Sequence, residues 1–291
     1  MNSRVEMPVW LRTTLAVGVF GLLFWLESRR PLRQRKVEAK LKRNARNLAV
    51  AALAAGTLQF VERPVAIGFA EFVEARQFGL LKAVQLPKWL ELVLAVILLD
   101  YTLYWWHVLT HRIPILWRFH VAHHVDLDMD ASTALRFHFG ELAVSVPWRA
   151  AQVVVIGVSP LALSVWQGLL LISIIFHHSN VRLPIELERW LNFLVVTPRM
   201  HGIHHSMVPE ESSSNWSSGL TVWDWLHGTL RLNVPQNEVV IGLPAYRRPV
   251  DVGLIEVLKM PFSTQRPSWQ LPEGGTPSRP ETVVSAERLL A

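Results

Sequence analysis

The sequence predicts an all-α integral membrane protein, a helical bundle of about four transmembrane segments, with or without a re-entrant helix, that carries a histidine-rich helical cap. Three observations lead to this fold class. Long apolar runs alternate with short polar stretches, all 12 histidines fall between His107 and His227, and strand-type alternation is nowhere sustained. The 291 residues are 51% hydrophobic and include no cysteine. The missing cysteine excludes disulfides, thiolate-bound zinc, iron–sulfur clusters and a cysteine nucleophile.

The first two apolar runs predict one clear span and one irregular segment. The first run, Pro8–Leu26, is followed by strong positive charge and has no small-residue cleavage site after it. Both features favour a signal-anchor helix over a signal peptide. The second run, Leu48–Val61, has only 14 residues before Glu62, Arg63 and Pro64 interrupt it. Because this length is marginal for a span, we expect a kinked or re-entrant segment there.

The later apolar runs predict three further membrane segments. Trp89–Thr110 is long enough to span a membrane, and the aromatic residues near its end are typical of the membrane interface. Ala150–Val181 has 32 residues without Asp, Glu, Lys or Arg, and Ser159-Pro160 divides it. We therefore expect two antiparallel helices, one reaching back toward Leu142 and one over Leu161–Phe176.

The net charge of +6 is concentrated in one loop. Residues 29–46 contribute +8, so the remainder of the chain carries −2. No nucleic-acid-binding fold or base-stacking pattern accompanies these bases, which argues against a nucleic-acid partner. A basic cluster between two apolar runs is instead typical of a cytoplasmic membrane loop. Counting crossings from this loop places every histidine at or beyond the cytoplasmic ends of the helices.

The predicted organisation is one membrane-embedded domain over residues 1–262, with its catalytic core at about residues 89–232. The rest of the chain, residues 263–291, is rich in Pro, Ser, Gly and Glu. This composition predicts a disordered tail.

The histidines recur at helical spacing, which predicts a cytoplasmic-side, di-metal helical cap. His107 and His111 form an HxxxH motif, and HxxHH follows at residues 120–124 and again at residues 201–205. Residues three and four apart share one helix face, and imidazole is a ligand for iron, zinc, copper and nickel. Eight ligands exceed what one tetrahedral zinc uses, so we expect two metal ions. An isolated histidine such as His227 is more typical of a hydrogen-bonded interfacial residue.

Beyond the histidines, the sequence resembles the fatty acid hydroxylase/sterol desaturase superfamily of integral-membrane histidine-box di-iron enzymes. The resemblance covers about residues 98–232 and the plan of helices before them. The matching motifs are Leu116–His124, Asp130–His138, Phe176–Val181, Asn215-Trp216, Leu220–Asp224 and Gly228-Thr229.

The resemblance implies an oxidoreductase that uses O2 and external electrons to hydroxylate an unactivated C–H bond of a sterol, fatty acyl or related lipid. Two Fe ions are the implied cofactors, and zinc is able to replace them in a recombinant preparation. The implied electron donor is separate, a reductase with cytochrome b5 or a ferredoxin. Desaturation, ether-lipid oxidation and carotenoid hydroxylation stay open within the same superfamily, although the HxxxH spacing favours hydroxylation.

The resemblance also implies which residues bind metal. No catalytic residue is expected beyond the di-metal centre, and the expected ligands are His107, His111, His120, His123, His124, His178, His201, His204 and His205. Three further residues are weaker candidates, namely His138, His177 and Asn180. Asp130, Asn215 and Asp224 are expected to orient ligand imidazoles through their second nitrogen.

Two functions from other classes compete with this interpretation. A haem-binding electron carrier needs isolated histidines facing each other across the membrane, not HxxHH clusters at helix ends. A metal transporter needs polar and acidic groups along the membrane path, where the sequence offers only Asp100 deep in a span.

Overall fold

The computed structural model describes residues 8–34 and 37–279, and this part of the chain is helical, with isolated β-bridges but no strand. The all-α fold class is therefore confirmed. The long helices are α1 (Val9–Arg29), α2 (Lys40–Thr57), α3 (Arg63–Arg76), α4 (Lys88–Arg112), α6 (Phe139–Ile156) and α7 (Pro160–His178).

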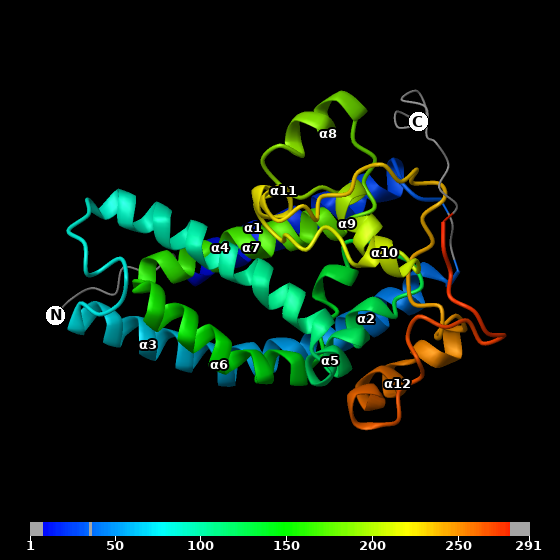
Figure 1. The fold of residues 1–291 in the computed structure, drawn as a ribbon, viewed down its shortest axis with the longest axis horizontal. Helices are drawn as coiled ribbons and strands as arrows, with labels where there is room; N and C mark the ends of the chain where they lie inside the picture. The colour runs from blue at the N-terminus through cyan, green and yellow to red at the C-terminus, as the bar shows by residue number, and fades with distance from the viewer. Residues whose placement is uncertain (1–7, 35–36, 280–291) are drawn as a thin grey trace.

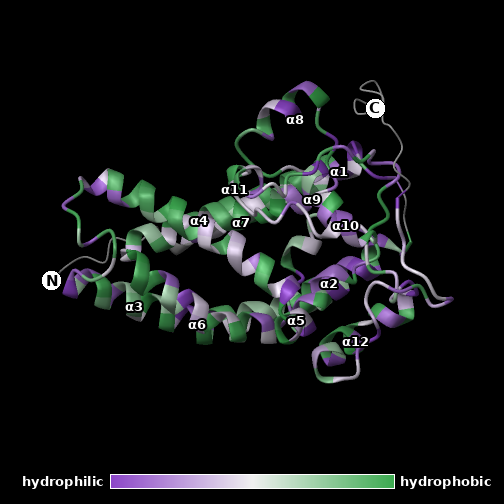
Figure 2. Ribbon diagram, in the orientation of Figure 1, coloured by the Kyte–Doolittle hydropathy of each residue, from purple (hydrophilic) through white to green (hydrophobic). Residues whose placement is uncertain are grey.

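Four helices among the described residues are long and apolar enough to cross a membrane, as predicted. They are Lys40–Arg76, Lys88–Arg112, Phe139–Ile156 and Pro160–His178. The predicted first span corresponds to α1, which packs against α7 but is not among these four. Figure 2 shows hydrophobic colour along most of α3, α4, α6 and α7, whereas hydrophilic colour gathers at the end of the bundle near α2 and α10.

The interrupted second run forms one continuous helix and not a re-entrant loop. Between α2 and α3, Leu58–Glu62 makes a π-helical turn, in which the Arg63 N–H donates to the Leu58 carbonyl five residues earlier. Pro64 has no N–H to donate in the next turn, so the interruption predicted from its position is a local change of hydrogen bonding.

Helices α1, α4 and α7 run in one direction, the continuous α2–α3 helix and α6 run in the other, and α3 lies at the end away from the shorter elements (Figure 1). After α1, the Leu32 N–H donates to the carbonyl of Asn180, which follows α7. At the opposite end, the Leu80 and Leu81 N–H groups of the α3–α4 turn donate to the Val155 and Ile156 carbonyls of α6. As a result, α1, α4 and α7 finish where α2 and α6 begin.

The shorter elements cover the end of the bundle where these helices meet. We call them the cap. They are α5 (Pro114–His124), η2 (Thr133–Leu135), α8 (Ile185–Leu191), α9 (Pro198–His204), α10 (Pro209–Ser212), α11 (Val222–Leu226), η3 (Pro249–Val252), α12 (Leu254–Lys259) and η4 (Met260–Phe262).

The basic stretch at residues 29–46 does more than set charge on one side of a membrane. Arg43 and Arg46 are buried, and both reach Asp126, which is fully buried at the end of α5. Asn47 and Thr133 donate to the same carboxylate, each at 2.9 Å. This cluster ties the start of α2 to the chain between α5 and α6.

The predicted disordered tail packs against the cap over the residues that the structure describes. Trp269 stacks on Trp117 with ring centroids 5.9 Å apart, and Arg266 donates to the Ala245 carbonyl at 2.8 Å. Arg279 pairs with Glu211. Composition suggested disorder because it does not register these individual aromatic and charged anchors. Residues 280–291 of the predicted tail lie outside the described residues.

Asp126→Ala should lower the free energy of unfolding by about 2–3 kcal/mol, because Arg43 and Arg46 then lose a fully buried carboxylate and keep only their second acidic partners. Glu186→Gln, which breaks an exposed pair with Arg189, should cost under about 1 kcal/mol. Thermal unfolding of the purified proteins in one detergent measures both. Equal stability of the two variants would contradict the structural importance of Asp126.

Candidate metal centre

The cap and the helix ends bring all nine principal predicted ligands into one buried region. His107 and His111 lie on the last turns of α4, three histidines end α5, His178 ends α7, and three more lie on or directly after α9. The helical spacing of HxxxH and HxxHH turns each set toward the same side. Segments up to 98 residues apart in the sequence, from His107 to His205, thus contribute to one site.

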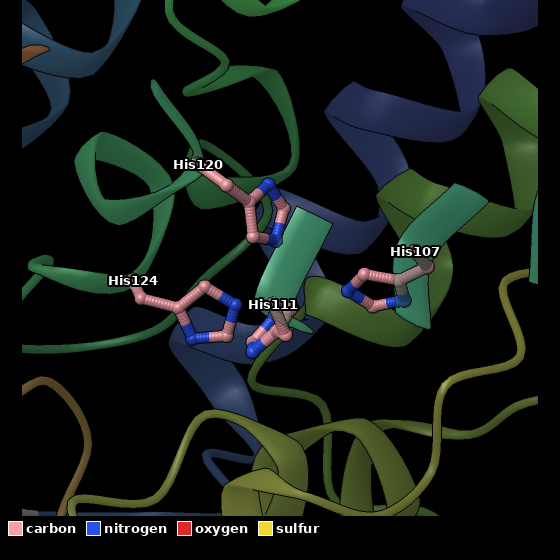
Figure 3. A group of neighbouring side chains, drawn as sticks. All are labelled: His107, His111, His120 and His124. Carbon is pink, nitrogen blue, oxygen red and sulfur yellow. The ribbon is translucent and has the colours of Figure 1, made fainter. Parts of the chain in front are cut away.

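The first group consists of His107, His111, His120 and His124, with potential ligand atoms all within 4.8 Å of one another. Figure 3 shows the four rings converging from α4 and α5. The Nε2 atoms of His111, His120 and His124 are buried and have no hydrogen-bond partner among the described residues. Buried polar nitrogens normally have a partner, so this arrangement fits a shared cation.

The second group consists of His123, His178, His201 and His205, again within 4.8 Å. The Nε2 atom of His178 lies 3.0 Å from those of both His123 and His201, and the Nε2 atoms of His201 and His205 are 3.2 Å apart. His204 lies between the two groups and forms a third cluster with His124 and His205.

Burial favours the neutral form of five imidazoles in and beside the cap, which is the form that binds metals. Burial, reinforced by the neighbouring imidazoles, lowers the pKa of His123, His124, His201 and His205 well below that of free imidazole. Burial also lowers the pKa of His204, to about 3. The donor set is entirely imidazole nitrogen, which suits first-row transition metals such as iron and zinc.

Hydrogen bonds to the second ring nitrogen fix the orientation of four imidazoles. His107, His178 and His204 donate through Nδ1 to the carbonyls of Trp216, Ile174 and Ser214, at 2.7, 2.7 and 2.9 Å. Because a carbonyl only accepts, Nδ1 carries the hydrogen and Nε2 keeps its lone pair for a metal. His120 is the fourth, with Nδ1 at 2.8 Å from Glu141 Oε1.

Glu141 was not among the residues predicted from the sequence. It is buried in the first turn of α6, at the edge of a membrane helix. The available signal was an acidic residue beside an apolar segment, which in membrane proteins usually marks a functional position.

The weaker ligand candidates lie outside both groups of four. His138 caps α6 by accepting from the Gly140 N–H through Nδ1, and its Nε2 donates to the Leu258 carbonyl. The Asn180 side chain accepts from the Arg33 N–H and donates to the Arg33 carbonyl. His177 lies closest to a group, with its ring centroid 4.1 Å from that of His201.

The side chains of the three residues predicted to orient imidazoles bind to other groups. Asp224 accepts from the N–H groups of Trp216 and Ser217, and it thereby positions the Trp216 carbonyl that holds His107. Asn215 bonds the Met200 carbonyl and the Arg231 backbone. Asp130 pairs with Arg43.

A cavity of about 780 Å³ leads from the membrane helices to the histidines. Its walls come from α1, the α2–α3 helix, α4, α6 and α7, and they are mainly apolar. At its inner end the cavity is lined by His107, His120, His123, His177, His178 and His201. Both groups therefore contribute rings to the end of one elongated apolar space.

The amino-acid sequence of the chain is similar to those of several known proteins. Over 183 residues the chain is 30% identical to the ornithine lipid hydroxylase OlsE of Rhizobium tropici, an alignment that covers 62% of this chain and 52% of that protein. It is 31% identical over 142 residues to the alkylglycerol monooxygenase of Xenopus tropicalis, covering 49% of this chain and 30% of that protein. It is 29% identical over 147 residues to the mouse cholesterol 25-hydroxylase, covering 48% and 46%.

The chain thus spans about half the length, or less, of these curated relatives. No solved structure matches it significantly. The family model for fatty acid hydroxylase matches residues 92–229, a segment that contains every histidine of both groups. Residues 92–229, with their two groups of converging imidazoles, therefore belong to the fatty acid hydroxylase family.

Proposed function

We propose that this protein is a membrane di-iron oxygenase that hydroxylates an unactivated C–H bond of a lipid. The observation that carries the proposal is that both four-histidine groups contribute rings to the lining of one mainly apolar cavity. The relatives are named as hydroxylases and a monooxygenase of lipids, and these names support the same reaction class.

Each group of four is proposed to hold one iron, with His204 as an additional ligand between them. When bound, the two ions supply the chemistry that activates O2 and oxidises the lipid carbon. We leave His138 and Asn180 out of the ligand set, since their polar atoms are engaged elsewhere, and we retain His177 as a candidate.

The protein's own contribution is to orient the proposed ligand rings and to exclude water from the reacting carbon. Glu141 and three backbone carbonyls set which nitrogen of four rings faces inward. The buried position of the rings limits access of water to the reacting carbon. The apolar walls accommodate an acyl or sterol body that enters from the bilayer, so the carbon at its end meets the histidines.

The histidine end is proposed to face the cytoplasm, because Arg29, Arg30 and Arg33, which precede α2, lie at that end. A separate electron donor, a reductase with cytochrome b5 or a ferredoxin, is proposed to approach the cap. The reaction needs external electrons because hydroxylation by O2 reduces the second oxygen atom to water.

The purified protein should carry close to two metal ions per chain, and His123→Ala should reduce this to about one, because it removes a ligand from the second group alone. His227→Ala is the matched control, since His227 stacks on Tyr101 and Tyr104 outside both groups. Elemental analysis of freshly isolated protein gives the count. A content near zero in intact wild-type protein, or a Soret band, would contradict the proposal.

Glu141→Ala should weaken metal binding by roughly 10–100-fold, because His120 then loses the carboxylate that fixes its ring. Competition with a chelator of known affinity measures the change. Glu256→Ala, on the exposed face of α12, should leave the affinity unchanged. The role assigned to Glu141 fails if both variants retain metal equally well.

Cells that express the gene should contain an oxygenated lipid that is missing when the gene is deleted, because the proposed reaction inserts one oxygen atom from O2. Comparative lipidomics identifies the lipid, and growth under isotopically heavy O2 shows the origin of the oxygen. Expression of His123→Ala should not restore the product. A desaturated lipid in its place would move the assignment to the other reaction of the superfamily.

A further inference from the structure

A buried ion pair lies within the membrane-spanning part of the bundle, away from the histidines. Glu62, the last residue of the π-helical turn, and Arg149, in the middle of α6, are 5% and 8% exposed. Arg149 Nε lies 3.4 Å from Glu62 Oε1. Both residues belong to helices that are long and apolar enough to span a membrane.

This pair lines the same cavity as the histidines. Glu62, Ser145 and Arg149 all contribute to the cavity wall. Ser145 donates to the Glu62 carboxylate at 3.4 Å, and Arg149 also donates to Gln152 at 2.6 Å. We call Glu62, Ser145 and Arg149 the polar cavity cluster.

The helix geometry places the cluster at a defined distance from the metal centre. On α6, Glu141, Ser145 and Arg149 are spaced four residues apart and so lie along one face. At 1.5 Å per residue, Arg149 lies about 12 Å along the helix axis from Glu141, which holds His120. The cavity therefore has a polar position on its wall and a separate histidine end.

Three features indicate that the cluster does more than stabilise the fold. Charged residues within membrane spans are costly, and those that occur usually serve function. The hydrogen bonds to Glu62 are both long at 3.4 Å, so its carboxylate retains capacity to accept a shorter one. In addition, π-helical turns inside α-helices occur frequently at functional sites, and this one ends at Glu62.

Resting on the proposed function, we propose that the polar cavity cluster binds a neutral hydrogen-bonding group of the lipid substrate, a hydroxyl or an amide, and so determines which carbon reaches the metals. Glu62 and Arg149 compensate each other's charge, so an ionised ligand group would add uncompensated charge to an apolar space. A hydroxyl or amide instead offers a donor to Glu62 and an acceptor to Arg149.

Equilibrium binding to the full chain in nanodiscs tests the proposal with three probes. Methyl oleate has no added polar group on its chain, methyl ricinoleate carries one hydroxyl there, and oleamide presents an amide. Wild-type protein should bind methyl ricinoleate or oleamide roughly tenfold more tightly than methyl oleate. Glu62→Gln and Arg149→Met should reduce this preference to near unity, and Ser145→Ala should reduce it several-fold while perturbing the fold least.

Glu91→Gln is the matched control, because Glu91 is also buried and paired, with Lys82, but lies outside the cavity wall. It should retain the wild-type preference. Equal binding of all three probes by wild-type protein would overturn the proposal, as would a preference that survives Glu62→Gln, Arg149→Met and Ser145→Ala.

The binding assay requires no O2 or electron donor, which separates this inference from the proposed function. Selective binding without lipid oxidation would refute the proposed function alone. Oxidation of lipid by a protein that shows no preference would refute the role of the polar cavity cluster alone.

Discussion

Nine imidazole rings meet in one region, and the buried nitrogens of these rings need partners. One nitrogen faces the shared centre, and for four rings the other is taken by a carbonyl or by Glu141. Burial lowers the pKa of His123 and His124, which favours the neutral ring with a lone pair available. The helix ends, the short α9 and the loop after it are positioned by these contacts.

The bases near α2 connect this centre to the membrane helices. Asp126 follows two residues after His124 and receives Arg43 and Arg46, so the end of α5 is anchored to the start of α2. Arg33 reaches the cap by donating to Gln236, and a Cβ at position 202 would lie 2.2 Å from its Nη1 atom. A glycine inside the second HxxHH motif therefore lets α9 approach the α1–α2 connection.

Local patterns in the sequence predicted the spans, from the length of the apolar runs, and eight of the nine histidines, from their helical spacing. The ninth, His178, was implied by the family resemblance. HxxxH and HxxHH place rings on one face whatever the rest of the chain does. Glu141 and the carbonyls of Trp216, Ser214 and Ile174 were not predictable in the same way, since their contacts join segments distant in sequence. The continuity of the helix through Glu62 also escaped prediction, because a π turn leaves no periodic signal.

The cavity relates these observations to reactivity. A lipid chain in an apolar cavity has nearly the same binding free energy at each position along the cavity. The reason is that the free energy of burial depends on area and has no direction. Presenting a single carbon to the histidines requires a directional contact elsewhere on the molecule. Among the residues lining the cavity, Glu62 and Arg149 are proposed to make such a contact, and Glu141 orients His120 on the same face of α6. One helix thereby carries both the polar position and the carboxylate that orients His120, so a shift of α6 would move the two together.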